Sequence, residues 1–286
     1  MNPDHLTLIT VADTYIESRL RLLADLLSTP LLSNGPPEIV TPWIFFPNSF
    51  PPARYGGDGH EVIDELSLVP PSIAGYRMYA GGKLELLTKL SNGESYSKVS
   101  RIDRVSSKIG KSGELTFVDI LHEVSDDTSR SLVFRDLQNL VYVTQRREPR
   151  QIVVADTPAK GLFGFKGSQD ILSAEFVADA SMLFRYSALT YNGHKIHLDR
   201  NYCREVESLP GLVVHGPLLA TVGATIVNRL CGDGEQIKEL SFRLHSTLFE
   251  DELAEFSIER QKLSFNGSAT ANGGLIITFE GEIGSL

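Results

Sequence analysis

The sequence contains few cysteines and no long run of apolar residues. Its two cysteines, Cys203 and Cys231, exclude a disulfide scaffold and are typical of a protein from a reducing compartment. No run reaches the roughly 18 apolar residues of a transmembrane helix, so we expect no membrane span. Residues 1–10 lack the cationic start and apolar core of a signal peptide. We therefore expect a cytoplasmic protein, with the mitochondrion as the alternative.

Basic residues are also in the minority. The chain has 27 lysines and arginines against 36 acidic residues, which gives a net charge of −9. Nucleic acids and anionic membranes bind concentrated basic surfaces, so we expect neither as a partner. The apolar share of 42% is ordinary for a globular protein, and 286 residues allow either one domain or two.

The first half predicts one helix followed by strands. Apolar residues recur near helical spacing over residues 9–28, and residues 41–75 indicate irregular structure or short helices. Four β-rich segments separated by short turns predict an antiparallel meander over residues 82–90, 96–107, 114–124 and 131–144. The polar, glycine-rich stretch that follows is typical of a linker, which we bound at residues 151–173.

The second half predicts one buried helix and a further sheet. We expect a strand at residues 181–190, an irregular segment over 191–212, and an apolar helix over 216–231 that begins beside Pro217. Three β-rich segments follow, at residues 236–249, 252–264 and 273–283. One helix wrapped by an antiparallel sheet is the hot-dog plan. The sequence therefore predicts an α+β double hot-dog, with halves at residues 1–150 and 174–286, in which two sheets each wrap a central helix.

Three of the seven histidines lie within residues 194–215. His194 and His197 fall in a predicted loop, and His215 stands where the buried helix begins. A single loop histidine is usually a surface residue, but three around one helix start indicate a functional site. A metal site built from His194, His197 and either His215 or Asp199 is an alternative. No cysteine pair or His-Glu motif supports it, so we expect neither a metal nor another cofactor.

The segment around these histidines resembles a known family. Asn192-Gly193-His194-Lys195-Ile196-His197 is similar to the Asp-x-Asn-Pro-x-His motif of the MaoC-like and (R)-specific enoyl-CoA hydratases. His215-Gly216-Pro217-Leu218 resembles the helix start of the same family. The surrounding residues, with Arg77-Met78-Tyr79-Ala80-Gly81-Gly82, resemble the double hot-dog branch of mesaconyl-CoA hydratases and mitochondrial 3-hydroxyacyl-thioester dehydratases. The resemblance implies a metal-independent lyase that adds water to an enoyl thioester or removes it from a 3-hydroxyacyl thioester.

The resemblance also implies roles for individual residues. His197 stands at the acid–base position, and an imidazole can both take and give a proton near neutral pH. Asn192 replaces the aspartate of the motif, and since an amide cannot ionise we expect it to position rather than to act as the base. His194 is the candidate to replace that aspartate. The backbone N–H of Gly216, at the positive end of a helix, is expected to stabilise the thioester oxyanion.

Further expectations concern the substrate and its partners. We expect His215, Tyr191 and Arg200 to bind the substrate, with Arg200 directed toward the phosphates of coenzyme A or phosphopantetheine. The N-terminal half is expected to shape the acyl pocket without catalytic residues. The nearest substrate class is a branched or dicarboxylic acyl-CoA such as mesaconyl-CoA, and a 3-hydroxyacyl chain on acyl carrier protein is the alternative. A catalytically inactive hot-dog binding module and a thioesterase stay open. So does the oligomeric state, with a homodimer as one option.

Overall fold

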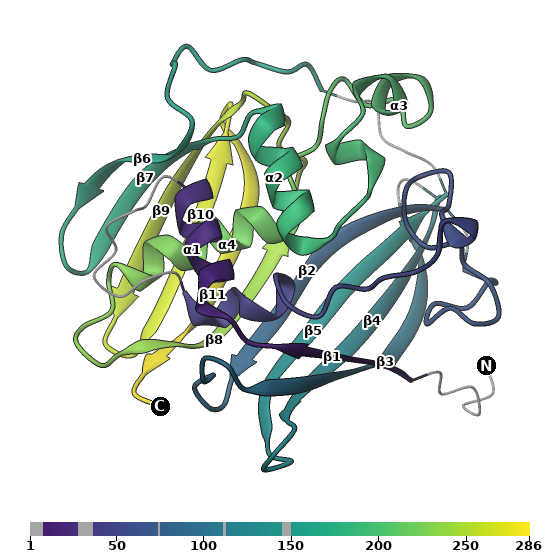
Figure 1. Cartoon of the computed structure of the whole chain (residues 1–286). Helices are drawn as coiled ribbons and strands as arrows, with labels where there is room; N and C mark the ends of the chain where they lie inside the picture. The colour runs from purple at the N-terminus through teal and green to yellow at the C-terminus, as the bar shows by residue number, and fades with distance from the viewer. Residues whose placement is uncertain (1–7, 28–36, 74, 111–112, 145–149) are drawn as a thin grey trace.

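A single sheet runs through the computed structural model, which describes residues 8–27, 37–73, 75–110, 113–144 and 150–286. Its eleven strands lie in the order β1-β3-β4-β5-β2-β8-β11-β10-β9-β7-β6 (Figure 1). All neighbouring pairs are antiparallel. The strands are β1 (Ile9–Thr14), β2 (Tyr76–Leu86), β3 (Ser95–Gly110), β4 (Gly113–Asp126), β5 (Leu132–Val143), β6 (Gly161–Gly167), β7 (Ile171–Val177), β8 (Gln236–Leu244), β9 (Leu253–Gln261), β10 (Ser264–Ala271) and β11 (Gly274–Gly284).

Strands β2 and β8 join the two halves of the chain. β2 pairs with β5 on one side and with β8 on the other. The strands approach closely at Gly81, where a Cβ atom would lie 2.3 Å from the carbonyl oxygen of Phe242. Only glycine allows this approach without moving the backbone. The two predicted sheets are therefore one continuous sheet.

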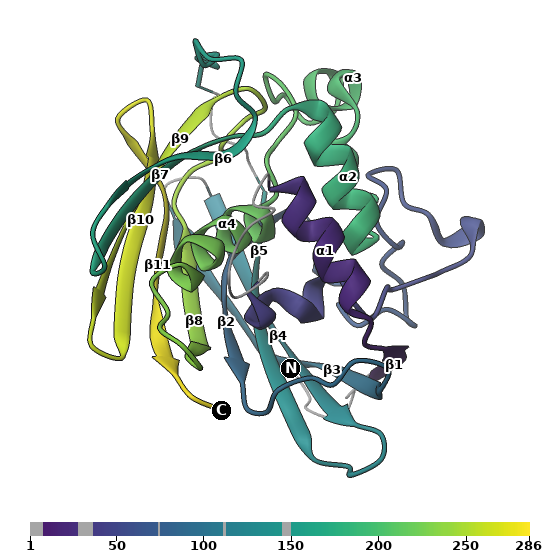
Figure 2. The same cartoon turned by 60° about the vertical axis from the view of Figure 1, so that its left-hand side comes forward.

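Helix α4 (Gly216–Asn228) lies in the curve of the C-terminal half of the sheet, and all its residues from Leu218 to Asn228 are buried. Helices α1 (Glu17–Leu26) and α2 (Ala180–Thr190) pack side by side over it, on the side away from the sheet (Figure 2). The remaining helical segments are short: η1 (Glu38–Trp43), η2 (Pro52–Arg54), η3 (Lys195–His197) and α3 (Arg200–Glu205). No helix among the described residues is long and apolar enough to cross a membrane. One buried helix held by an antiparallel sheet confirms the predicted α+β hot-dog class.

Two predictions in the first half are wrong. The helix predicted over residues 9–28 is strand β1 followed by α1, because β1 adds to the edge of the sheet beside β3. The predicted meander is correct for β3, β4 and β5, but β2 does not neighbour β3; it crosses to the far side of β5. The predicted short helices within residues 41–75 correspond to the last residues of η1 and to η2.

The second half also departs from several predictions. The strand predicted at residues 181–190 is helix α2, because Asp179 caps it by accepting a hydrogen bond from the Met182 N–H at 2.8 Å. Residues 151–173, predicted as a linker, include β6 and the start of β7, which form an edge hairpin. The stretch after α4 forms four strands, β8 to β11, instead of the three predicted. The predicted helix over 216–231 and the turn at Asn272-Gly273 are confirmed, both turn residues having positive φ.

Candidate active site

A cavity of about 560 Å³ is lined by residues from both halves of the chain, and histidines from both halves meet in it. His60 comes from the loop after η2, while His194 and His197 come from the loop after α2 and His215 immediately precedes α4. The His60 and His194 rings are 4.2 Å apart between centroids, and the His194 and His197 rings 5.6 Å. The structure thus adds one histidine to the three that the sequence singles out.

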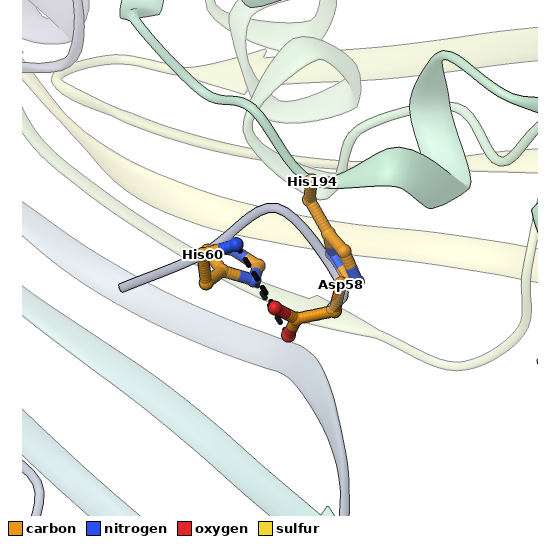
Figure 3. Close-up of side chains that lie close together, drawn as sticks. All are labelled: Asp58, His60 and His194. Atoms are coloured by element: carbon orange, nitrogen blue, oxygen red, sulfur yellow. Dashed lines mark hydrogen bonds and ion pairs between the residues drawn. The ribbon is translucent and has the colours of Figure 1, made fainter. Parts of the chain in front are cut away.

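Asp58 fixes the position of His60 (Figure 3). One carboxylate oxygen accepts a hydrogen bond from the backbone N–H of His60 at 2.9 Å, and the other lies 3.2 Å from its Nδ1. The carbonyl of Asp58 accepts a hydrogen bond from the Lys195 N–H at 2.8 Å, which ties this loop to the motif loop. A carboxylate on one imidazole nitrogen leaves the other nitrogen, Nε2, to exchange protons.

The motif loop folds around Asn192. Its backbone N–H donates to the Ser187 carbonyl at 2.8 Å, and its side-chain oxygen accepts a hydrogen bond from the His194 N–H at 3.0 Å. The Asn192 amide is therefore used to shape the turn. His197 follows in η3, and its Nδ1 donates to the Val213 carbonyl at 2.7 Å. This bond fixes the proton on Nδ1 and leaves Nε2 as an acceptor.

His215 packs against His197. The two rings stack at 3.6 Å with an interplanar angle of 18°. The Nε2 of His215 lies 2.9 Å from the Ser187 hydroxyl, and its Nδ1 is buried without a partner among the described residues. Gly216 follows directly, lines the cavity, and begins α4. A Cβ there would lie 2.4 Å from the Leu244 side chain, so glycine is what allows Leu244 to pack against the helix start.

Burial keeps the motif histidines neutral. It lowers the pKa of His197 to about 4, against the opposing hydrogen bond to Val213. Burial also lowers the pKa of His194 and His215, and nearby histidines add to both shifts. For His60, burial and the charge of Arg77 lower the pKa, while Asp58 opposes them. Burial raises the pKa of Asp58, but the hydrogen bond and charge of His60 outweigh it, so the carboxyl is ionised.

The other predicted binding residues divide into two groups. Tyr191 ends α2 in a left-handed conformation and lines the cavity. Arg200 does not line it; its guanidinium pairs with the Glu250 carboxylate, with Nε 2.8 Å from Oε1. Asp199, named in the alternative metal set, caps α3 by accepting hydrogen bonds from two backbone N–H groups.

Sequence reasoning missed the Asp58–His60 pair. Asp58, His60 and His194 each offer one potential ligand atom, all within 4.8 Å of one another, which is a different set from the predicted metal alternative. Both carboxylate oxygens of Asp58 already contact nitrogens of His60. The geometry therefore favours proton transfer over metal binding at these residues.

Comparison with known proteins identifies the family of the chain. The family model for hydroxyacyl-thioester dehydratase type 2 matches residues 40–250. The chain belongs to this family. The hydroxyacyl-thioester dehydratase type 2 family unites hydro-lyases, which confirms the predicted enzyme class and the predicted resemblance.

Two curated relatives of the family are similar in sequence. The chain is 32% identical over 216 residues to a mesaconyl-C(4)-CoA hydratase of Chloroflexus aurantiacus, covering 76% of this chain and 71% of that protein. It is 28% identical over 191 residues to a mitochondrial hydroxyacyl-thioester dehydratase type 2 of Schizosaccharomyces pombe, covering 66% of this chain and 54% of that protein. The chain thus spans about half the length of the second relative.

Solved structures share the fold. A MaoC-like dehydratase superposes with a TM-score of 0.67 at 13% identity, covering 97% of both chains. A MaoC-like dehydratase from Phytophthora capsici gives a TM-score of 0.65 at 14% identity and covers both chains completely. The fold that this chain shares with these two structures extends over nearly its whole length.

Proposed function

We propose that this protein interconverts an enoyl thioester and its 3-hydroxyacyl thioester, using His197 and the Asp58–His60 pair for proton transfer. The observation that carries the proposal is the contact of this pair with His194 of the motif loop, beside the start of α4. The family motif has an aspartate where this chain has Asn192, and Asp58 of the pair supplies a carboxylate in its place. The reaction needs two proton transfers and one site for negative charge, and each has a candidate group here.

His197 is the proposed base for dehydration. It takes the proton from the α-carbon through Nε2, which is unprotonated because Nδ1 donates to Val213. Its pKa of about 4 keeps it neutral and ready to accept a proton at physiological pH. His215 stacks on its face and holds the ring in place.

The Asp58–His60 pair is the proposed acid in the same direction. Asp58 opposes the lowering of the His60 pKa by burial and Arg77, and the protonated fraction of His60 gives its proton to the leaving hydroxyl as the C–O bond breaks. Water departs and the enoyl double bond forms. Hydration runs these steps in reverse, with His60 taking a proton from the attacking water and His197 returning one to the α-carbon.

The start of α4 is the proposed site for the thioester oxygen. The first backbone N–H groups of a helix have no partner within the helix and lie at the positive end of its dipole. Gly216 provides such a group, lines the cavity and has no side chain of its own. The enolate that forms when His197 removes the α-proton places its charge on this oxygen.

The substrate, its carrier and the compartment belong to the proposal. A branched or dicarboxylic acyl-CoA such as mesaconyl-CoA is the first candidate, since one relative is named for it, and an acyl-carrier-protein thioester is the second. We retain the cytoplasm as the proposed compartment, with the mitochondrion as the alternative because the yeast relative is named mitochondrial. A division into halves at residues 1–150 and 174–286 is also retained, except that β6 and β7 join residues 151–173 to the C-terminal half. Contrary to the expectation of a non-catalytic N-terminal half, that half supplies Asp58 and His60 to the proposed catalytic set.

The test is a direct assay of the conjugated thioester. Purified protein is mixed with enoyl-CoA and 3-hydroxyacyl-CoA esters, and with the same acyl groups on carrier protein, and the enoyl absorbance is followed. We expect turnover of at least one pair, and a loss of about 10²–10⁴-fold in kcat for His60→Gln. His245→Gln is the matched control, because His245 is an exposed histidine at the same cavity that contacts Thr278.

Three outcomes would contradict the proposal. Folded protein that turns over none of these esters would favour the binding-module interpretation. Turnover that survives His60→Gln would leave His197 as the catalytic histidine and remove the role of the pair. Release of free thiol from the thioester would instead indicate a thioesterase.

A further inference from the structure

A second set of polar residues lines the same cavity, away from the histidine motif. Lys98 and Ser100 on β3, His122 on β4, and Asp136 and Gln138 on β5 all face it, and we call these five residues the polar row. Ser100 stands opposite His122, and His122 stands opposite Asp136, so three of them cross the sheet at one level. Polar groups on the inner face of a sheet cost free energy unless they are paired, and the proton transfers proposed above use none of these.

Asp136 is the buried carboxyl group of the polar row. It is 6% exposed, and one carboxyl oxygen, Oδ2, accepts a hydrogen bond from the Trp43 indole N–H at 3.0 Å. The other oxygen, Oδ1, is buried with no hydrogen-bond partner among the residues that the structure describes. A buried carboxyl oxygen without a partner is costly, and when this oxygen carries the proton it offers an unpaired donor to a ligand oxygen.

Lys98 is the cation of the polar row. Its ammonium donates to the Phe46 carbonyl at 3.3 Å, and no carboxylate of the described part of the chain lies within 4.0 Å of it. An ammonium has three donors, so two are left for a ligand. His122 is bound to the Ser100 hydroxyl at 2.7 Å, and burial lowers its pKa to about 3, so it adds no charge.

The charge state of Asp136 suits an anionic neighbour. Burial raises its pKa to about 7, while the Trp43 hydrogen bond and the charge of Lys98 oppose the shift. The groups that act on it or face it are Lys98 from β3, His122 from β4, Tyr79 from β2 and Trp43 from η1. Near neutral pH a large share of Asp136 is therefore protonated and able to donate a hydrogen bond.

An aromatic wall connects the polar row with the start of α4. Tyr79 lies beside Gly216, and its ring stacks on that of Phe242 with 5.9 Å between the centroids. The Trp43 ring meets the Phe242 ring edge-on at 5.8 Å, and its indole N–H donates to Asp136. Tyr79 pairs with Leu140, four residues along β5 from Asp136. At about 3.4 Å per residue this places Asp136 roughly 14 Å along the strand from the level of Tyr79, which lies beside the helix start. An apolar chain of that length would pack against the aromatic rings.

We propose that the polar row binds a carboxylate at the far end of the acyl chain, so that the substrates are ω-carboxyacyl thioesters. This inference rests on the proposed function, in which the thioester lies at the start of α4. Lys98 would pair with the carboxylate, and Asp136 would donate to it. The separation favours a chain of medium length, so this inference departs from mesaconyl-CoA, the first candidate above, whose main chain is short.

The test measures binding without turnover. Saturated butanoyl-, hexanoyl-, octanoyl- and decanoyl-CoA, and the ω-carboxylate counterpart of each, are titrated into the full-length protein by calorimetry. We expect the ω-carboxylate ester of a medium chain to bind about tenfold to a hundredfold more tightly than its methyl-ended partner. Lys98→Met should remove this ratio, while Lys108→Met, an exposed lysine on the same strand, should leave it unchanged.

Each contrary result is distinct. Equal or tighter binding of the methyl-ended esters would overturn the proposal, as would a Lys98→Met variant that weakens both esters equally. A carboxylate preference confined to the butanoyl pair would also overturn it. Because saturated esters are not hydrated, the ratio of the two binding affinities can be measured even if no enoyl thioester is turned over. A failure of the proposed function is therefore distinguished from a failure of this inference.

Asp136→Asn gives a second measurement, since an amide oxygen can still accept from Trp43. In the unaltered protein the binding ratio should fall as pH rises through about 7, because Asp136 ionises and then repels the carboxylate. In Asp136→Asn the ratio should not change over this range. A pH-independent ratio in the unaltered protein would contradict the role given to Asp136.

Discussion

Gly59 and Gly193 touch backbone to backbone, where the loop of Asp58 and His60 meets the motif loop. Gly59 has a φ of +91°, and a Cβ atom built on it would lie 2.0 Å from the carbonyl oxygen of Gly193. A Cβ on Gly193 would in turn lie 3.0 Å from the carbonyl oxygen of Gly59. Position 59 therefore requires glycine for the two loops to meet, and a side chain at position 193 would make a tight contact with the Gly59 carbonyl. The distance between His60 and His194 depends on this contact.

The first prediction follows from that contact. Gly59→Ala should separate the loops and lower kcat by about 10²-fold, because catalytic groups displaced by about 1 Å lose most of their effect. Steady-state assay and the melting temperature are measured together. Gly57→Ala is the control, since a Cβ there meets nothing within 4 Å. Unchanged kcat in Gly59→Ala would show that the loops need not touch for catalysis.

The second prediction concerns His197. His197→Gln should lower kcat by about 10²–10⁴-fold with a much smaller change in KM, because the base acts on the reacting proton rather than on binding. Circular dichroism checks that the variant is folded. A folded variant with the kcat of the unaltered protein would remove His197 from the mechanism.

The third prediction concerns pH. Because the pKa of His197 is about 4, kcat/KM should persist as pH falls through 6.5, the ordinary histidine pKa, and should be lost nearer pH 4. Asp58→Asn removes the charge that stabilises protonated His60, so it should move the alkaline limb for dehydration to lower pH. An acid limb at the ordinary histidine pKa, or an alkaline limb that Asp58→Asn leaves in place, would contradict these assignments.

The fourth prediction concerns Asn192. Asn192→Asp keeps the oxygen that accepts from the His194 N–H but adds a negative charge beside the histidines, which raises their pKa values. The acid limb should move to higher pH, and kcat should stay similar or fall. A tenfold rise in kcat, which corresponds to about 1.4 kcal/mol of barrier, would instead identify position 192 as the place of a lost base.

The fifth prediction concerns metals. Dialysis against a chelator should leave kcat unchanged, because the Asp58 carboxylate contacts His60 through both oxygens and serves proton transfer. Elemental analysis of the purified protein gives an independent measurement. Loss of activity on chelation, with recovery on adding a divalent cation, would show that Asp58, His60 and His194 bind a metal.

The sequence predicts helix α4 better than helix α2, for a physical reason. Apolar residues all round the helix, Pro217 in the first turn and glycines beyond the end mark 216–231 without reference to the rest of the chain. In α2 the residues that become buried, Met182, Leu183, Tyr186 and Ser187, follow helical spacing, but Phe184 and Leu189 interrupt the pattern. Only the Asp179 cap distinguishes a helix from a strand there. Asp179 is identified as a cap only if a helix is already assumed to begin after it.

The sequence predicts only those active-site residues that lie close together along the chain. His194, His197 and His215 are recognised because they fall in one motif segment around one helix start. Asp58 and His60 belong to a Gly-Gly-Asp-Gly-His loop with no pattern of its own, far away in the chain. Their place beside His194 depends on β2 crossing to β8, and the predicted meander did not contain that crossing.

The pairing of β2 with β8 also determines what would happen if the chain were cut between residues 150 and 160. Each fragment would then end its sheet in a strand whose backbone N–H and C=O groups had lost their partners. Such bare edges recruit other strands, so separate fragments would be prone to aggregate unless they met each other first. Mixing the two fragments during refolding should therefore protect both, and an aggregation assay would detect the protection as a loss of light scattering.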